Sequence, residues 1–475
     1  MFGLIDVFWA YILIAILILL GRLIRQRLGI LRSLYIPSSI VAGIIALLLG
    51  KSALGAIVQS IDPKSPLVQG IFTENIQAVW SQSPSIFINI VFATLFLGQY
   101  VPTLQEFWRK AAPQVALGQA IAWGQYVVGI ILAITILTPV FDLPPIVACL
   151  IEVAFEGGHG TSAGMAATFT DLGFSAGQDL SLALATVGLI SGVVSGTILI
   201  HWGRRTGKIQ VSREPSDHLE NAENELPKEE PSVTIARKNL VRDLLIDPLS
   251  LNFGFVGLAI AIGWLILEAL RFIESITWGR NGVQLISYVP LFPIALIGGI
   301  IVQYIVMRTR RTYLISRPLM ENIGGLALDI TIVTALASIS LSVLGDNLVP
   351  FLILSIAGIA WNVCAFVFLG PHLLPFYWFE RGLGDMGQSM GVTSTGLLLL
   401  RMVDPDNQSG AFESFAYKQL LFEPIVGGGL FTAAAPLLIV NFGSIPILLL
   451  TSFILAFWLI FGFYNCKQLR KQGAN

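Results

Sequence analysis

Long apolar runs separated by short polar stretches cover most of the chain. The hydrocarbon core of a bilayer, about 30 Å thick, needs ~20 mostly apolar residues per helix. We find such runs at 4–24, 35–51, 84–102, 113–138 and 180–203 in the first half of the chain, and at 251–270, 283–307, 322–345, 348–370, 415–440 and 443–464 in the second. The pattern therefore predicts an all-α polytopic membrane protein.

The only long polar stretch, rich in Glu and Pro, lies at 204–248 and separates the two halves. It is typical of a partly disordered cytoplasmic linker. The expected divisions are a first transmembrane repeat at 1–203, the linker at 204–248, a second repeat at 249–440, and an extra C-terminal span with its tail at 441–475.

Basic residues gather at the ends of the apolar runs and predict the orientation. The clusters are Arg22–Arg32, Arg109–Lys110, Arg204–Arg205, Arg308–Arg311 and Lys467–Lys471. All of them face the cytoplasm if the N-terminus is outside, as the positive-inside rule requires. Each repeat then has five spans, so the second enters the membrane upside down relative to the first. This inverted-repeat arrangement is typical of secondary transporters.

Composition supports a protein that is solvated by lipid. Of the 475 residues, 55% are hydrophobic and 12% are charged, about half of the charge content usual in soluble proteins. The net charge of −1 gives no basic field that would attract nucleic acid. The three cysteines are far apart and predict neither a disulfide framework nor a zinc site.

Two segments are apolar at their edges but contain glycines, hydroxyls and charges in the middle. They are 144–170, with Glu156–Gly164 at its centre, and 371–402, with Gly387–Gly396 at its centre. Irregular backbone at membrane depth is tolerated only where protein or a watery cavity satisfies its polar groups. We therefore expect two re-entrant hairpins with Gly-rich tips, which enter from opposite faces. Such tips can offer N–H groups to carboxylates and carbonyl oxygens to sodium, although glycines can also serve helix packing alone.

These hairpins carry a resemblance to bacterial sodium/glutamate symporters. The matching stretches are Glu156–Thr161, Gly173–Phe174 and Ala185–Leu189 in the first half, with Ile36–Pro37, Val41–Gly43 and Phe92–Thr94 before them, and Gly391-x-Thr393-x-Thr395 in the second. The resemblance implies opposed hairpins in two inverted five-span repeats, an elevator-like motion, and sodium-driven uptake of glutamate across the bacterial inner membrane. Sodium is the coupling ion and no other cofactor is implied; a homodimer is left open.

The expected site residues come mainly from the two hairpins. Substrate binding is expected at Glu156, Gly157, Gly158, His159, Gly160, Thr161, Gly391, Thr393, Thr395 and Arg401. Sodium binding is expected at Thr161, Ser162, Thr393, Ser394, Thr395 and Asp329. Glu156 stands where the family has a small hydroxyl residue, and Leu399–Arg401 and the extra C-terminal span also depart from its pattern.

Several of these residues allow a second interpretation. Glu156 could form a salt bridge or face water at the end of its hairpin, His159 could cap backbone carbonyls, and Arg401 could cap the second hairpin. Glu423 is expected to pair with Lys418 on the same helix and is given no role.

Other functions stay open at this point: symport of another small carboxylate or amino acid, coupling to protons, a channel, or an intramembrane enzyme. No His-Glu-x-x-His zinc pattern occurs, and the four histidines are scattered. We therefore expect no enzyme. A channel usually needs a ring of identical subunits, whereas this chain contains its own inverted pair.

Overall fold

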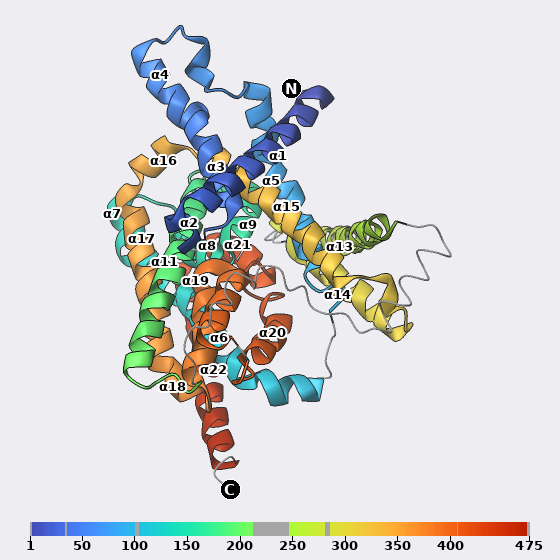
Figure 1. Ribbon diagram of the computed structural model, residues 1–475, viewed down its shortest axis with the longest axis vertical. Helices are drawn as coiled ribbons and strands as arrows, with labels where there is room; N and C mark the ends of the chain where they lie inside the picture. The colour runs from blue at the N-terminus through green and yellow to red at the C-terminus, as the bar shows by residue number, and fades with distance from the viewer. Residues whose placement is uncertain are drawn as a thin grey trace. The chain divides into compact units, whose positions relative to one another are not determined.

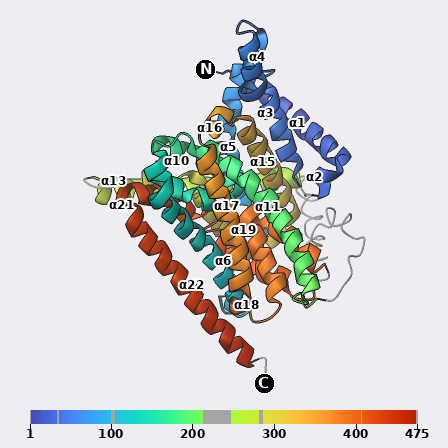
Figure 2. The same cartoon turned by 90° about the vertical axis from the view of Figure 1, so that its left-hand side faces the viewer.

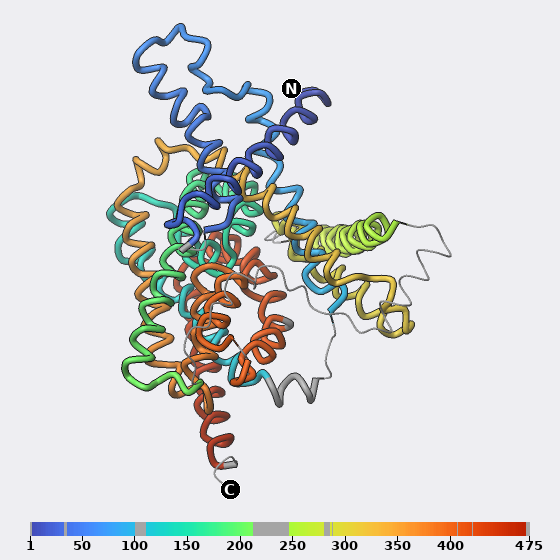
Figure 3. The backbone as a smooth tube through the Cα atoms, viewed as in Figure 1, coloured from blue at the N-terminus to red at the C-terminus, as the bar shows by residue number. Residues whose placement is uncertain are grey.

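The computed structural model describes residues 2–33, 36–99, 104–211, 247–280, 286–405 and 407–472, most of which are coloured in Figure 3. The described residues are helical, with no strand among them. Most of the linker, 212–246, lies outside the described residues.

The α-helices follow in chain order (Figure 1). They are α1 (Leu4–Arg27), α2 (Gly29–Ser33), α3 (Ser38–Leu49), α4 (Ala56–Ile61), α5 (Glu74–Thr94), α6 (Leu104–Leu132), α7 (Thr138–Phe141), α8 (Leu150–Phe155), α9 (Gly158–Gly164), α10 (Ala166–Asp171), α11 (Gly177–Arg205), α13 (Pro248–Ile276), α14 (Leu291–Arg308), α15 (Arg317–Ala337), α16 (Leu341–Asp346), α17 (Leu348–Cys364), α18 (Gly370–Leu373), α19 (Trp378–Val403), α20 (Ala411–Phe422), α21 (Leu430–Phe442) and α22 (Ser444–Gln472).

Within the described part of the chain, nine helical segments are long and apolar enough to cross a membrane. They are Leu4–Arg27, Ser38–Ile61, Ala111–Phe141, Gly177–Arg205, Pro248–Ile276, Leu291–Arg308, Arg317–Ala337, Leu348–Leu373 and Ser444–Lys471. The predicted all-α, multi-span class is confirmed. Two of the eleven expected spans, 84–102 and 415–440, are not among the nine.

The expected span 84–102 was placed too late. Helix α5 begins at Glu74 and ends at Thr94. Its end is capped by the Arg317 guanidinium, whose Nη1 donates to the carbonyls of Thr94, Leu95 and Leu97 at 3.1, 2.8 and 3.2 Å. These donations satisfy carbonyls that the helix leaves without intrahelical partners.

The expected span 415–440 is wrong as a single helix. It is divided into α20 and α21 by an irregular stretch at 423–429. Pro424 lacks the N–H that would continue the helix, and Gly427 and Gly428 have φ of +72° and +100°, in the left-handed region. A proline followed by three glycines therefore breaks an otherwise apolar segment.

The chain forms two compact units, each taking residues from both halves of the sequence. Unit 1 comprises residues 1–86, 107–211 and 329–475, and unit 2 comprises 87–106 and 212–328. In unit 2, α13 packs closely on α14 because Gly263 and Gly298 meet the backbone of Ala295 and Ala259. In unit 1, α11, α17 and α19 lie side by side, and α22 is a long straight helix (Figure 2).

Helix α19 folds back on itself and forms a hairpin, here called hairpin 2 (378–403). Gly391 and Val392 are non-helical, with Val392 at φ 61° and ψ 176°. A Cβ on Gly384 would lie 2.9 Å from Leu400 Cγ, although these residues would be about 24 Å apart along a straight helix. The chain therefore reverses at Gly391–Val392, inside the predicted segment 371–402.

The other hairpin comes earlier in the chain and is here called hairpin 1 (144–171). It approaches α6 from the C-terminal end of that helix. Its first arm runs down α6 from the C-terminal end, because Ala148 packs on Gly129 and Glu152 bonds to Tyr126. Hairpin 2 comes up from the N-terminal end of α6: Gln114 donates to the carbonyl of Arg381 and Gln125 to that of Ser389, at 3.0 and 2.7 Å. The two hairpins thus converge along one helix.

The second arm of hairpin 1 returns along α11. His159 contacts Thr186 at 2.9 Å, and further on Phe169 packs against Gly177 at the start of α11. The end of α11 lies beside the start of hairpin 2, where Gly203 packs on Phe379. Helix α11 therefore runs antiparallel to α6. Hairpin 1 both begins and ends near the C-terminal end of α6.

Candidate functional site

The tips of the two hairpins touch. Gly158 has a φ of +70°, and a Cβ placed on it would overlap Cγ1 of Val392. Beside this contact, Gly188 of α11 packs against the carbonyl oxygen of Met390. The predicted Gly-rich tips are therefore brought together by backbone that only glycine allows to approach so closely.

A third interruption, the irregular stretch 423–429, lies at the same place. Glu152 of hairpin 1 accepts from the Gly427 N–H at 2.9 Å and from the Thr432 hydroxyl at 2.8 Å. At the other end of the stretch, Glu423 accepts from Thr393, the residue that follows the tip of hairpin 2, at 3.0 Å. We call the meeting of these three interruptions (156–158, 391–393 and 423–429) the junction.

The junction contains buried oxygens without hydrogen bonds. Within the described ranges, the atoms of hairpins 1 and 2 in this state near the tips are both carboxylate oxygens of Glu156 and the hydroxyls of Thr161, Ser162 and Ser389. Burying a polar atom without a partner costs about 1–3 kcal/mol, so such atoms normally have a reason to be there. Carboxylate and hydroxyl oxygens can all act as acceptors toward a cation or an ammonium group.

Glu156 is 3% exposed. The alternative in which it faces water at the hairpin end is therefore wrong. The Ser389 hydroxyl and the Lys418 ammonium both attract its carboxylate, and the carboxylates of Glu152 and Asp385 repel it. Glu152, one turn earlier, is fully satisfied by contrast, because it also accepts from the Tyr126 hydroxyl.

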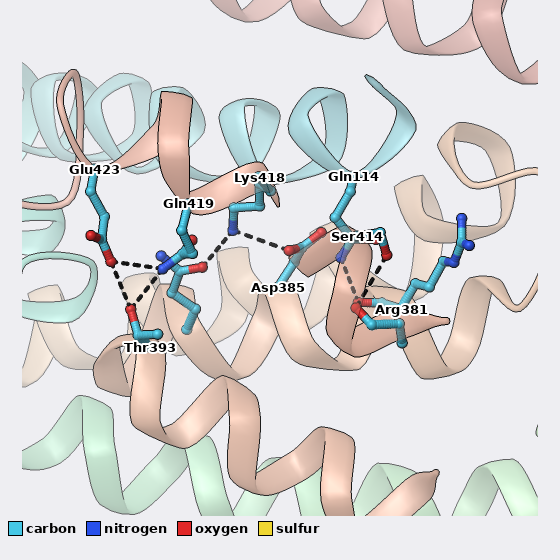
Figure 4. Close-up of polar contacts among 10 residues, drawn as sticks. Gln114, Arg381, Asp385, Thr393, Ser414, Lys418, Gln419 and Glu423 are labelled. Atoms are coloured by element: carbon cyan, nitrogen blue, oxygen red, sulfur yellow. Dashed lines mark hydrogen bonds and ion pairs between the residues drawn. The ribbon is translucent and has the colours of Figure 1, made fainter. Parts of the chain in front are cut away.

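The hydroxyl groups of hairpin 2 differ from those of hairpin 1. Thr393 donates to Glu423 and accepts from Gln419 Nε2 at 2.7 Å, as Figure 4 shows. Thr395 donates to the carbonyl of Gly391 at 2.6 Å, and Ser394 is exposed. On hairpin 2 the hydroxyls of Thr393 and Thr395 therefore already have partners, whereas the hydroxyl of Ser389, like those of Thr161 and Ser162 on hairpin 1, has no hydrogen bond.

The remaining predicted residues are not all at the tips. The imidazole of His159 bonds to the side chain of Thr186 and not to a backbone carbonyl. Arg401 is exposed in the last turn of α19. Asp329 lies on α15, where its carboxylate interacts with the Ser39 hydroxyl of α3 and not with either hairpin tip.

The sequence analysis did not identify α20 and the irregular stretch 423–429 as parts of the site. Lys418 donates to Asp385 and Gln388 of hairpin 2, and Glu423 accepts from Thr393 and Gln419. The signal that could have revealed this stretch was Pro424 followed by Gly427–Gly429 within an apolar run.

A family model described as Sodium/glutamate symporter matches residues 4–369, most of the chain. The chain belongs to the sodium/glutamate symporter family. It is also 23% identical over 442 residues to the sodium/glutamate symporter of Haemophilus influenzae, in an alignment that covers 92% of this chain and 97% of that protein. No solved structure matches the chain significantly.

Membership confirms the resemblance seen in the sequence and makes the chain a multi-pass membrane transporter and not an enzyme. Residues 160–164 and 387–391 both read Gly-x-Ser-x-Gly, the pattern of a hydrolase nucleophile elbow. Such an elbow lies at a strand-to-helix turn, whereas 160–164 lies within α9 and 387–391 ends the first arm of hairpin 2, and neither follows a strand. The two serines are therefore symporter hairpin residues, not nucleophiles.

Proposed function

We propose that this protein takes up glutamate with sodium, by an elevator-like alternating-access motion. The observation that carries the proposal is the contact between Gly158 and Val392 at the tips of the two opposed hairpins. Buried oxygens of Glu156, Thr161, Ser162 and Ser389 without hydrogen bonds gather at these tips. A junction of interrupted helices is how transporters bring helix N-termini and unwound carbonyls to a substrate and its coupling ion.

The substrate has one ammonium and two carboxylates, and the junction offers groups for each. In our proposal the Glu156 carboxylate attracts the ammonium, directly or through a bound sodium ion. Backbone N–H groups at Gly157–Gly160 and after Gly391 take the carboxylates, since helix N-termini favour negative charge. His159 and Thr161 of hairpin 1, and Thr393 and Thr395 of hairpin 2, complete the contacts.

Sodium, in the same proposal, is held by hydroxyl and carboxylate oxygens, as suits a hard cation. Thr161 and Ser162 are the strongest candidates, because their hydroxyls are buried and lack hydrogen bonds. Thr393, Ser394 and Thr395 offer further hydroxyls on hairpin 2. Asp329 and Arg401 lie away from the tips in this structure; in our proposal Asp329 binds sodium and Arg401 contacts a substrate carboxylate.

The architecture that we propose is a pair of inverted five-span repeats with an added C-terminal span. The Gly-x-Ser-x-Gly spacing common to both hairpins supports a repeat, as does their approach from opposite ends of α6. In the proposed topology the N-terminus lies outside the bacterial inner membrane, and the linker and C-terminus lie in the cytoplasm.

Uptake by the purified protein in proteoliposomes tests this function. Radiolabelled glutamate should accumulate when sodium is higher outside than inside, and unlabelled aspartate and amine-free dicarboxylates should be measured as competitors. Accumulation driven by a pH gradient without sodium would instead identify proton coupling. Uptake that neither saturates nor needs a sodium gradient would identify a channel.

A further inference from the structure

Lys418 of α20 is a fully buried cation. Its ammonium lies 3.1 Å from Oδ1 of Asp385 and 2.5 Å from Oε1 of Gln388, both on the first arm of hairpin 2 (Figure 4). The side chains of Lys418 and Asp385 are each 0% exposed. Asp385 and Gln388 lie six and three residues before Gly391, where hairpin 2 reverses.

The rest of the Lys418 environment also resembles a cation site. The ammonium lies 4.1 Å from the ring centre of Phe422 and 5.2 Å from that of Phe415, distances at which an aromatic face attracts positive charge. The side chain passes so close to Gly118 of α6 that a Cβ there would lie 2.7 Å from Cε and 2.9 Å from Nζ. Two oxygens and two aromatic faces thus surround one positive charge in a tight space.

Stability alone does not account for this ion pair. Burying a lysine and an aspartate is often no better than apolar residues of similar volume, because both ions lose their hydration. The pair also does not stand alone, because the Gln114 side chain of α6 interacts with the Asp385 carboxylate. The ammonium attracts Glu156 of hairpin 1 as well, while Arg381, one turn before Asp385, attracts the aspartate.

We propose that Lys418 is a built-in cation, whose ammonium occupies a monovalent-cation site formed by Asp385, Gln388 and the rings of Phe415 and Phe422. By filling this site from within the chain, Lys418 sets how many cations must come from solution with each substrate. Its effect on uptake rests on the proposed sodium coupling, but its effect on cation binding does not.

The test removes the ammonium and asks whether an external cation takes its place. Lys418→Ala and Lys418→Gln are purified at full length, and their thermal unfolding is measured in choline, sodium or n-propylammonium chloride. Sodium and propylammonium should each raise the Tm of Lys418→Ala by about 2 °C or more beyond their effect on the wild type, since a ligand of the folded state stabilises it. The exposed Lys51→Ala is the control and should respond like the wild type.

Uptake in proteoliposomes gives the second readout. The sodium dependence of Lys418→Ala should become steeper, with a Hill coefficient higher by about one, because an additional ion is now required. If the wild type does not use sodium at all, the proposed function fails while the Tm test still stands.

Two results would overturn the proposal. In one, Lys418→Ala folds but gains no added stabilisation by sodium or propylammonium. In the other, neither single variant folds in any of the three salts, whereas the double variant Asp385→Asn, Lys418→Gln, in which both side chains are neutral, does fold. The side chains would then form only a structural ion pair.

Discussion

Gly158 and Val392 touch at the tips of two hairpins that come from opposite ends of α6, and both residues have positive φ. For glycine this conformation costs little, but for the β-branched Val392 it is strained, by about 1–3 kcal/mol. Strain of this kind persists only where the surroundings impose it. The packing around the tip, of which this contact is a part, therefore holds hairpin 2 in a shape that it would not adopt alone.

Replacing Gly158 by Ala should be far more harmful than replacing another glycine of similar backbone. Gly158→Ala adds a methyl group that overlaps Val392 and also forces alanine into positive φ. Gly173 is the matched control, because its φ is +79° and a Cβ there would meet nothing within 4 Å. We expect Gly158→Ala to lower stability by at least ~1 kcal/mol more than Gly173→Ala, from overpacking. Thermal unfolding of both variants measures the difference.

A second substitution shows whether the added cost comes from Val392. The double variant Gly158→Ala, Val392→Ala has a shorter side chain at 392. It should recover part of the stability and uptake that Gly158→Ala loses, because the effects of substitutions at contacting residues are not additive. Equal effects of Gly158→Ala and Gly173→Ala, with no recovery in the double variant, would mean that the tips do not touch.

Sodium affinity should depend most on Thr161. Its hydroxyl is buried without a hydrogen bond, whereas that of Thr395 already donates to Gly391. Thr161→Val, Thr393→Val and Thr395→Val should each raise the sodium concentration for half-maximal uptake. Thr161→Val should do so by about 5- to 30-fold, as expected from ~1–2 kcal/mol. Unchanged sodium dependence in all three variants would count against sodium binding at the hairpins.

The sequence predicted the helical class, most of the spans and both hairpins, because these depend on local signals. Long apolar runs need helices in lipid, and a run interrupted by glycines, hydroxyls and charges is unlike an ordinary span. The span at 415–440 was wrong for a related reason: its apolar composition outweighed Pro424 and Gly427–Gly429. The early end of α5 could not be predicted, since it depends on Arg317, far away in the sequence.

For the site, the sequence identified the tips but not their partners. Glu156, Gly158 and Thr161 were found because they interrupt an apolar run. The contacts of Asp385 with Lys418, and of Thr393 with Glu423, join segments about 30 residues apart. Such pairings follow from tertiary packing, which no local spacing determines.

Two glutamates one turn apart should differ sharply when neutralised. Glu152 accepts hydrogen bonds from Tyr126, Gly427 and Thr432, so the amide nitrogen of Glu152→Gln would face a donor. We expect a loss of about 1–3 kcal/mol and a lower Tm. Glu156→Gln keeps an oxygen that can accept from the Ser389 hydroxyl and removes a buried negative charge beside Glu152 and Asp385, so it should leave the Tm unchanged or raise it. Thermal unfolding of the two variants checks this, and the opposite order would contradict the assignment.

Accessibility of introduced cysteines tests the orientation, since the two native cysteines that remain, Cys149 and Cys466, are buried. In a Cys364→Ser background, Gln472→Cys and Ser216→Cys, which lies in the linker, should react only with reagents that reach the cytoplasm. Lys64→Cys, in the loop after the second span, should react from outside. Labelling of Gln472→Cys from the periplasm would reverse the topology or add a span.

Glu156→Gln provides the most direct test of the central claim, that substrate binds where the two hairpin tips meet. Its uptake of glutamate should be compared with that of a dicarboxylate without the amine, in proteoliposomes with equal amounts of wild type and variant. A buried charge left without its mate costs roughly 3–5 kcal/mol, so glutamate uptake should fall by more than about 100-fold while the amine-free substrate is affected much less. Transport of glutamate by Glu156→Gln at the wild-type rate would contradict the account.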